Sequence, residues 1–406
     1  MASEQHLGTK VRRLRRLADL TQEGLAEASA VSVDVIRKLE QQRRGSVALP
    51  TLHALAHGLG VELTSLIGDP PGAPSTGEAD SPQLVAVRRA IMPPLFAAPA
   101  EPAGPEKLTP SHLRAEITDG WTLYHDAQFG RLMELLPGII VDARFVASVG
   151  NSDERAAGQA ALGKALQLGG HLAIRMGKTD LALSSLERAM AAADASSDPL
   201  LAPMIANSVA WAYQRQNRLD DATTLAVHAA DAVEHGRRTG EADGTRVWGG
   251  LLMSAATSHA RGGDYDRADD LMRTAEQAAK RLARLPKPVN GKLLSIFSMS
   301  SVRVERVRLA VQHSRPEEAL ALAKGMRLSK DVPPSWRTWL LLDVARAHTD
   351  VGDAEGAVKA LESLKRQAPT WMRHHTLAVS IVSDLRDGAA RPPGLRALAA
   401  FLGVDE

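Results

Sequence analysis

The chain has 406 residues, a formal net charge of +2 at pH 7 and no cysteine. The absence of cysteine excludes disulfide bonds, thiol catalysis and cysteine-bound zinc, and it is typical of proteins in a reducing compartment. No N-terminal apolar leader occurs and no run reaches the ~18 apolar residues of a membrane helix, so we expect a cytoplasmic protein of two or three domains.

The first informative feature is a pair of short helical patterns between Thr21 and Arg44. Thr21 and Ser32 are suitable N-caps, and Ala30 and Val31 leave room only for a tight turn between the two helices. The second helix has an apolar face made by Val35, Ile36 and Leu39. Its outward face then consists of Val33, Asp34, Arg37 and Lys38.

The flanking residues complete a compact domain of five helices. An apolar stripe with many basic residues predicts a helix from Leu7 to Leu17, Pro50 opens a fourth helix, and Leu63 to Ile67 close the domain. The whole motif, LTQEGLAEASAVS…IRKLEQQRR…LPTLHALAHGLGVELTSL, resembles the phage repressor/Cro family of XRE-type regulators. We therefore expect a helix-turn-helix DNA-binding domain over residues 1–68.

The resemblance implies which side chains contact double-stranded DNA. The expected base contacts are Val33 with a thymine methyl, Asp34 with a cytosine amino group, and Arg37 or Lys38 with guanine. The resemblance places Gln22 on phosphate and within reach of a base, and we expect Ser32, Arg43 and Arg44 to bind phosphate. The alternative is a helix-turn-helix that is reused for contact with a protein.

One acidic residue of the second helix is expected to be structural. In the repressor/Cro family, the position of Glu40 commonly pairs with an arginine of the first helix, and alignment on Gln22 places Arg15 there. A half-buried carboxylate needs such a partner because an unpaired buried charge is costly. We predict an Arg15–Glu40 ion pair that does not contact DNA.

A linker is expected over residues 69–107. Proline, glycine, serine and threonine dominate residues 69–81, and a second stretch rich in proline and alanine follows at 92–106. Between them, Ser81 and Pro82 predict the start of a short helix that ends near Ile91.

The rest of the chain, residues 108–406, predicts helices and an internal repeat. A turn followed by a helix start recurs five times, and an alanine opens each second helix at intervals of 40, 46, 51 and 38 residues: Ala182, Ala222, Ala268, Ala319 and Ala357. Small residues at these positions allow close packing of helical hairpins. The pattern resembles the tetratricopeptide repeat family, whose repeats form an α-solenoid. Residues 108–150 are expected to add a divergent hairpin, and the residues after Arg391 a terminal capping helix.

The resemblance also implies a concave groove lined by the first helix of each hairpin. Asparagine can bind a peptide backbone with both a donor and an acceptor, and tryptophan supplies an apolar wall. Carried over by repeat phase, the predicted ligand-binding residues are Gln167, His171, Asn207, Trp211, Gln214, Arg261, Arg308 and Arg346. The alternative for each of them is an ordinary packing position.

The sequence contains no recognisable catalytic constellation, and no cofactor or metal site is expected. His53 and His57 have a spacing that can bind zinc, but no third ligand is nearby, and the pair at His374 and His375 is equally isolated. The Gly177-Lys178-Thr179 segment lacks the earlier glycine of a phosphate loop, because Leu172 occupies that position.

Together, the DNA-binding head, linker and repeats resemble the Rap/Rgg/NprR/PlcR/PrgX group of peptide-responsive regulators. The resemblance implies a transcriptional regulator that dimerises through its repeats, recognises a roughly palindromic operator and senses a peptide or small molecule. An alternative is a DNA-anchored scaffold whose repeats bind a partner protein. An enzyme fused to a DNA-binding head is disfavoured.

Overall fold

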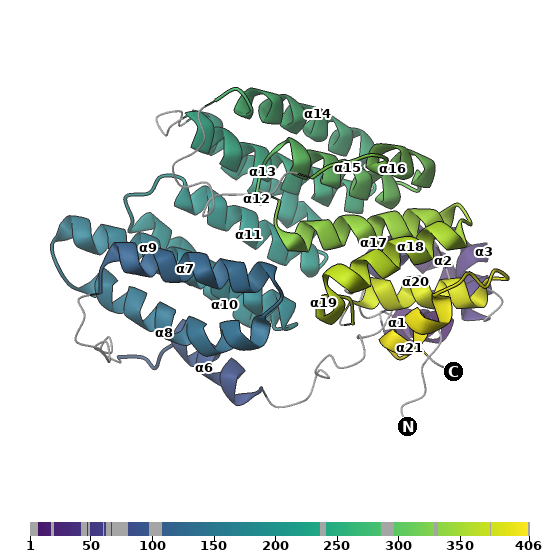
Figure 1. Cartoon of the computed structure of the whole chain (residues 1–406), viewed down its shortest axis with the longest axis horizontal. Helices are drawn as coiled ribbons and strands as arrows, with labels where there is room; N and C mark the ends of the chain where they lie inside the picture. The colour runs from purple at the N-terminus through teal and green to yellow at the C-terminus, as the bar shows by residue number, and fades with distance from the viewer. Residues whose placement is uncertain are drawn as a thin grey trace. The chain divides into compact units, whose positions relative to one another are not determined.

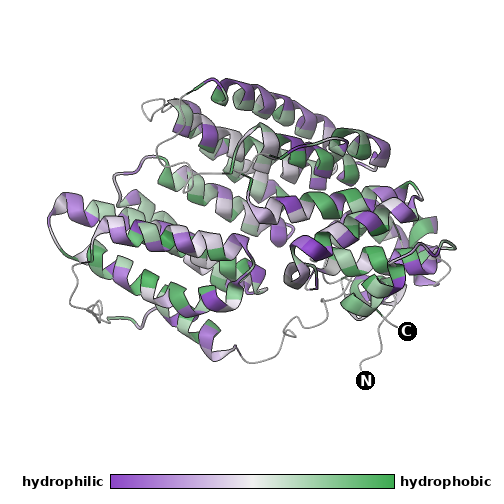
Figure 2. Ribbon diagram, viewed as in Figure 1, coloured by the Kyte–Doolittle hydropathy of each residue, from purple (hydrophilic) through white to green (hydrophobic). Residues whose placement is uncertain are grey.

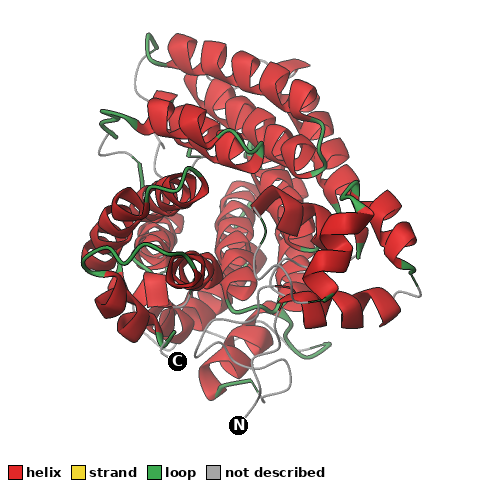
Figure 3. Cartoon of the chain, turned by 90° about the vertical axis from the view of Figure 1, so that its right-hand side faces the viewer, coloured by secondary structure: helices red, strands yellow, loops and turns green. Residues whose placement is uncertain are grey.

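The computed structural model describes residues 7–17, 20–41, 47, 49–59, 61, 66, 80–96, 108–235, 241–285, 296–328, 332–373 and 375–404. Within these ranges the secondary structure is helical and no strand occurs (Figures 1 and 3). The expected all-α fold class is therefore confirmed. The chain forms two compact units: unit 1 comprises Met1–Gly77, Thr257–Asp269 and Ser300–Glu406, and unit 2 comprises Glu78–Ala256 and Asp270–Met299.

Four helices form the N-terminal head within unit 1: α1 (Leu7–Leu17), α2 (Gln22–Ser29), α3 (Val33–Glu40) and α4 (Leu49–Gly58). Apolar side chains from all four helices are buried together: Val11, Leu25, Ile36, Leu39 and Leu55. The helices α1 and α3 touch at Gly8, where a Cβ would overlap the carbonyl oxygen of Leu39. Most of the expected fifth helix lies outside the described residues.

The remaining helices alternate in antiparallel hairpins. Unit 2 contains α6 (Pro82–Ile91), α7 (Pro110–His125), α8 (Phe129–Ser148), α9 (Ser152–Arg175), α10 (Thr179–Asp194), α11 (Leu201–Arg215) and α12 (Leu219–His235). The helices α13 (Glu241–Arg261) and α14 (Tyr265–Leu282) contribute residues to both units. Unit 1 continues with α15 (Met299–Gln312), α16 (Pro316–Ala323), α17 (Pro334–Asp350), α18 (Ala354–Gln367), α19 (Pro369–Arg373), α20 (Thr376–Asp387) and α21 (Leu395–Leu402).

The same turn joins the two helices of six hairpins. A left-handed residue with φ between 56° and 86° follows each first helix: Ala127, Gly177, Asn217, Gly263, Ser314 and Gly352. The next N–H then donates to a carbonyl five residues earlier, as from Lys178 to Ala173 at 2.9 Å and from Asp353 to His348 at 2.8 Å. This bond satisfies a carbonyl that the helix end would leave unpaired. The hairpin α7–α8 thus repeats the geometry of the five hairpins found in the sequence.

Small residues bring the helices of each hairpin together. The five alanines that open the second helices are buried, and so are the residues twelve positions earlier on the first helices: Gly170, Ala210, Ala256, Val307 and Ala345. In the first repeat a Cβ on Gly170 would lie only 2.7 Å from Cγ of Leu186. Second helices such as α14 and α18 have one hydrophobic face and one hydrophilic face, which Figure 2 shows as green and purple bands.

The short helix α6 is part of unit 2, although the sequence placed it within a linker. Ser81 caps the helix as expected, accepting a hydrogen bond from the N–H of Leu84. Leu84, Val87 and Ile91 are buried in the core that α8, α9 and α10 also form. Asp80 holds the start of the helix through ion pairs with Arg88 and with Lys178, at 2.9 and 2.8 Å. The helix buries an apolar face that the linker interpretation left without a partner.

The C-terminal end of unit 1 is closed by α20 and α21, which pack on each other. The helix α21 also packs against α18 and corresponds to the terminal helix expected after Arg391. In the part of the chain that the structure describes, no helix is long and apolar enough to cross a membrane.

Candidate nucleic-acid interface

The geometry of the head is set by caps at both helices of the predicted recognition motif. The Thr21 hydroxyl accepts a hydrogen bond from Gly24 N–H at 2.9 Å, and the Ser32 hydroxyl accepts one from Val35 N–H at 3.4 Å. Between the helices, Ala30 adopts a left-handed conformation with φ 52°. The caps and the left-handed Ala30 form the tight turn that the sequence predicted between α2 and α3. They thereby fix the angle between the two helices.

The outer face of α3 carries the side chains predicted to contact bases. Asp34, Arg37 and Lys38 are exposed and Val33 is half-buried, whereas Ile36 and Leu39 on the opposite face are fully buried. Lys38 Nζ lies 2.7 Å from Asp34 Oδ2, one helical turn away. The hydrogen bond from Lys38 lowers the pKa of Asp34, so this carboxylate is ionised at neutral pH.

The C-terminal end of α3 is fixed by an ion pair between Glu40 and Arg15 of α1. Arg15 Nε donates to Glu40 Oε1 at 2.7 Å, and the second nitrogen, Nη2, donates to Oε2 at 2.9 Å. Gln22 Nε2 also donates to Glu40 Oε2, at 2.8 Å. Burial raises the pKa of Glu40, but the hydrogen bonds from Arg15 and Gln22 outweigh that effect and lower it. A charged carboxylate is therefore held between α1, α2 and α3.

The four expected phosphate contacts, Gln22, Ser32, Arg43 and Arg44, have different outcomes. Ser32 is exposed at the start of α3, in a position where its hydroxyl also caps the helix. Gln22 is half-buried, and one of its two amide hydrogens is used by Glu40. Arg43 and Arg44 lie outside the described residues. The DNA-contact set therefore stays a prediction.

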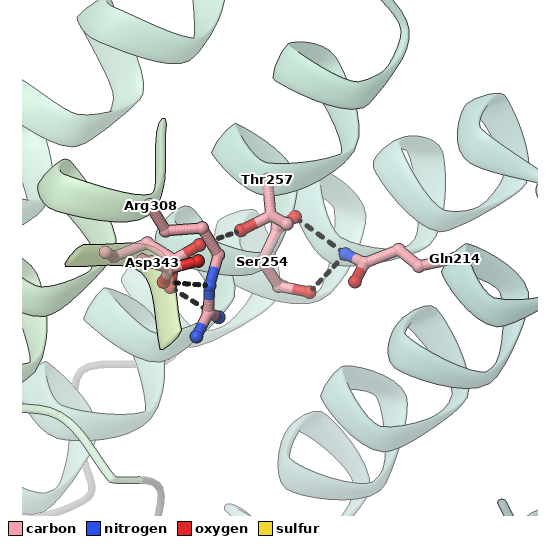
Figure 4. A network of polar contacts seen from close by, with 6 residues as sticks. Gln214, Ser254, Thr257, Arg308 and Asp343 are labelled. Carbon is pink, nitrogen blue, oxygen red and sulfur yellow. Dashed lines mark hydrogen bonds and ion pairs between the residues drawn. The ribbon is translucent and has the colours of Figure 1, made fainter. Parts of the chain in front are cut away.

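The predicted ligand-binding residues of unit 2 include several that bridge neighbouring helices. Gln167 of α9 donates to the Met204 carbonyl at 3.3 Å and to the Ser208 hydroxyl at 2.9 Å, both on α11. Gln214 of α11 donates in turn to the carbonyl and hydroxyl of Ser254 on α13, at 3.0 and 3.3 Å (Figure 4). Both glutamines are buried. A side-chain amide thus joins α9 to α11, and another joins α11 to α13.

Unit 1 repeats this arrangement with charged groups. Thr257 of α13 donates to Glu305 of α15 at 2.7 Å, and Arg308 of α15 donates to Asp343 of α17 at 3.4 Å (Figure 4). The next contact along the chain is from Arg346 of α17 to Asp384 of α20, at 2.7 Å. We call these contacts of unit 1 and the glutamine contacts of unit 2 the inter-repeat hydrogen bonds. The repeat phase located Arg308 and Arg346 correctly on the first helices, where they bind neighbouring carboxylates.

Burial changes the electrostatics of the Arg308 contact. Burial raises the pKa of Asp343 to about 6, although Arg308 works in the opposite direction. Arg308 is shared between Asp343 and Glu305, whose carboxylate lies 3.1 Å from Nη1 on the same helix. Its guanidinium also lies 5.1 Å from the centre of the Trp339 ring. One cation therefore serves two buried carboxyl groups.

The other predicted ligand residues of unit 2 lie in or next to an aromatic cluster. His171 packs against Trp211 and Trp121, with ring centres 4.8 and 4.9 Å apart, and its Nε2 lies 2.9 Å from the Ser208 hydroxyl. Burial lowers the pKa of His171 to about 3, so its ring is neutral. Arg175 lies over Trp211 at 5.4 Å. Asn207, one turn before Trp211 on α11, is half-buried and has no side-chain hydrogen bond among the described contacts.

Sequence reasoning missed the partners of these residues. Each acceptor of these hydrogen bonds lies two or three helices after the helix of its donor, on the first helix of the next hairpin. The acceptors include Ser208, Ser254, Asp343 and Asp384. A search of the repeat alignment for polar pairs between consecutive first helices can find such contacts. Arg261 of α13, also predicted for the groove, is half-buried in unit 1.

The weaker alternatives can be placed as well. No group of three potential metal ligands lies together within the described ranges, and His374 falls outside them. Gly177 forms the hairpin turn of the first repeat, and Lys178 pairs with Asp80. The turn interpretation of this segment is thus the one that the structure supports.

One comparison with known proteins identifies the head. A family profile described as a helix-turn-helix domain matches residues 6–66, so the N-terminal segment is a helix-turn-helix domain. No curated protein matches the chain. Among solved structures, the chain is similar to BtubC (BKLC) from P. vanneervenii, with 16% identity, a TM-score of 0.40, and coverage of 66% of this chain and 94% of the other. It is also similar to a Rap protein complexed with Competence and Sporulation Factor, with 10% identity, a TM-score of 0.44, and coverage of 73% and 87%. Similarities of this size do not bear on the function of the repeats.

Proposed function

We propose that the protein is a sequence-specific transcriptional regulator that places α3 in the major groove of DNA. The observation that carries this proposal is the exposed face of α3, where Asp34, Arg37 and Lys38 point away from the core. A helix fits the major groove, and side chains of these types bind base edges there. The ion pair of Arg15 with Glu40 supports the proposal, because it fixes the angle between α3 and the rest of the head.

A homodimer is the second part of the proposal. A single recognition helix contacts only a few base pairs, so a repressor-type head needs a second copy to specify an operator. Two copies related by a twofold axis place their α3 helices about 34 Å apart on a roughly palindromic site. The repeats are the part of the chain that we propose to hold the two copies together.

The test is selection of bound sequences from random DNA duplexes by the purified full-length protein. The expected product is a motif with two half-sites one helical turn apart. Gel shifts on that motif should weaken linearly with the logarithm of salt concentration, because phosphate contacts release counterions. The variant Arg37→Ala, which removes an exposed side chain of α3, should bind the motif more weakly. Failure of the wild-type protein to select any motif would overturn the proposal.

We further propose that the repeats sense a peptide or small molecule near Asn207 and Trp211. The half-buried Asn207 amide has a donor and an acceptor available, and the Trp211 ring next to it offers an apolar surface. A ligand acts on DNA affinity only through its different affinities for two states of the protein. A ligand that bound α11 would act on the hydrogen bonds of Gln167 and Gln214, which join α11 to its neighbours α9 and α13.

The alternative is a scaffold whose repeats bind a partner protein. It gains support from the inter-repeat hydrogen bonds, which engage several of the side chains first assigned to a small ligand. Gel shifts with and without a low-molecular-mass extract of the producing cells distinguish the two. A change in DNA affinity that Asn207→Ala abolishes supports sensing. Unchanged affinity together with a stoichiometric co-purifying protein supports the scaffold.

A further inference from the structure

The ion pair between Asp34 and Lys38 occupies the centre of the outward face of α3. The two charged atoms lie 2.7 Å apart, and the side chains are 63% and 54% exposed, respectively. An isolated aspartate on a DNA-binding face is repelled by the phosphates, whereas a neutral pair avoids this cost. Pairing also leaves binding capacity, because a carboxylate accepts several hydrogen bonds and an ammonium group has three donors.

The pair has the same spacing as the major-groove edge of one base pair. In a C·G pair the cytosine amino group donates to guanine O6, so these two groups lie about 2.9 Å apart. The groove therefore presents a donor beside an acceptor, and the protein presents the Asp34 acceptor beside the Lys38 donor. The two edges are complementary in both chemistry and spacing.

The same comparison distinguishes C·G from A·T. Guanine offers N7 as a second acceptor next to O6, so the ammonium of Lys38 can contact two acceptors. In an A·T pair, N7 lies on the other side, next to the adenine amino group, where it would repel the Asp34 carboxylate. The ammonium would still reach thymine O4, but the next group along the groove is the thymine methyl, which accepts no hydrogen bond, in place of guanine N7.

We propose that Asp34 and Lys38 act as one unit that selects a single C·G base pair in each half-site. The proposal rests on the DNA-binding function proposed above and makes it more specific. The competing explanation is an ordinary ion pair between successive turns of a helix, which would contribute only slightly to helix stability.

Binding-site selection with the wild-type chain, Asp34→Ala and Lys38→Ala tests the proposal. The wild-type protein should require C·G at one position of each half-site. Both variants should lose the preference at that same position, by about five- to a hundredfold. Their affinities for DNA that lacks the motif should change in opposite directions, because the first variant removes a negative charge and the second a positive one.

Glu355→Ala provides the control. Glu355 and Lys359 form a similar exposed pair, 3.6 Å apart on α18, and breaking it should leave the selected motif unchanged. Circular dichroism confirms that each variant remains helical. Relaxation at two different positions, or an unchanged motif in both variants, would overturn the shared role while the DNA-binding function stands. If the wild-type protein selects no motif, both proposals fail.

Discussion

Arg15 of α1 binds Glu40 of α3 through two parallel hydrogen bonds of 2.7 and 2.9 Å. This bidentate geometry fixes both the distance and the angle between the two helices. The side chains are 11% and 4% exposed, so little water screens the pair. Gln22 of α2 adds a third hydrogen bond to the same carboxylate. Three helices of the head thus meet at one charge, and the position of α3 depends on it.

Replacing Glu40 with alanine should destabilise the head by about 3 kcal/mol, because Arg15 is left as a half-buried charge without its partner. All six tryptophans lie outside the head, so tryptophan fluorescence reports on the repeats and circular dichroism on the whole chain. In urea, the variant should lose part of its helical signal early, while the fluorescence transition stays in place. Glu27→Ala, an exposed residue of α2, is the matched control. Identical unfolding of Glu40→Ala and wild type would contradict the prediction.

The Gln22→Ala variant should bind the selected operator about fivefold more weakly, the loss of roughly 1 kcal/mol of hydrogen bonding. One amide hydrogen of Gln22 is held by Glu40, which orients the rest of the amide. Because glutamine is uncharged, the slope of the logarithm of affinity against the logarithm of salt should stay unchanged. Gel shifts at four salt concentrations measure both quantities. A changed slope at unchanged affinity would show that this role is wrong.

Asp343 should make the stability of the repeats depend on pH. Its pKa is raised from 3.8 to about 6 by burial, so the folded protein holds this proton more tightly than the unfolded chain. The contribution to unfolding free energy should therefore fall as pH rises from about 4 to about 6, at up to about 1.4 kcal/mol per pH unit, and level off above.

The measurement is the urea midpoint of tryptophan fluorescence at several pH values in wild type and Asp343→Asn. Trp339 lies next to Arg308, the cation that Asp343 accepts a hydrogen bond from, so the signal comes from the same place. Subtracting the variant's pH profile from that of the wild type should isolate a fall in stability between about pH 4 and about pH 6. Parallel profiles would mean that Asp343 does not titrate in this range.

Gln167→Ala should destabilise the repeats by about 1 kcal/mol, because its amide joins α9 to α11 through Met204 and Ser208. Ser208→Ala should cost a similar amount, and the double variant less than the sum of the two. Gln367→Ala is the control, since that amide bonds only one turn away on an exposed surface. Unaltered stability of Gln167→Ala, combined with weaker response to a ligand, would favour the ligand-contact role first predicted for this residue.

The hairpin turns predict opposite effects for glycine substitutions. Gly352→Ala should cost about 1 kcal/mol although nothing lies within 4 Å of the added Cβ, because φ there is 80°. Ser314→Gly, at φ 56°, should stabilise the protein by a similar or smaller amount. Gly138→Ala in α8 also adds a Cβ to open space, and it should stabilise the helix by up to about 1 kcal/mol. Thermal unfolding ranks the three variants; equal signs for both glycine-to-alanine changes would contradict the turn geometry.

The helices and turns could be predicted from the sequence because their causes are local. Thr21, Ser32 and Ser81 cap helices with their own hydroxyl groups, and hydrophobic spacing identifies the buried face. The repeated alanines revealed the hairpins, since close helix packing requires small side chains wherever it occurs. The Arg15–Glu40 contact was also accessible, because the resemblance supplied its partner and burial of a charge demanded one.

The tertiary structure decided which polar side chains are available and which are already bonded. Four polar residues are of the types expected in a binding groove: Gln167, Gln214, Arg308 and Arg346. Their hydrogen-bond acceptors, however, lie 35 to 41 residues further along the chain. No local pattern marks such pairs, because they depend on how successive hairpins stack. The same stacking buries Asp343 and raises its pKa, and it brings the apolar face of α6 into the core of unit 2. Sequence determined the elements through short-range forces, whereas long-range packing assigned a partner to each polar group.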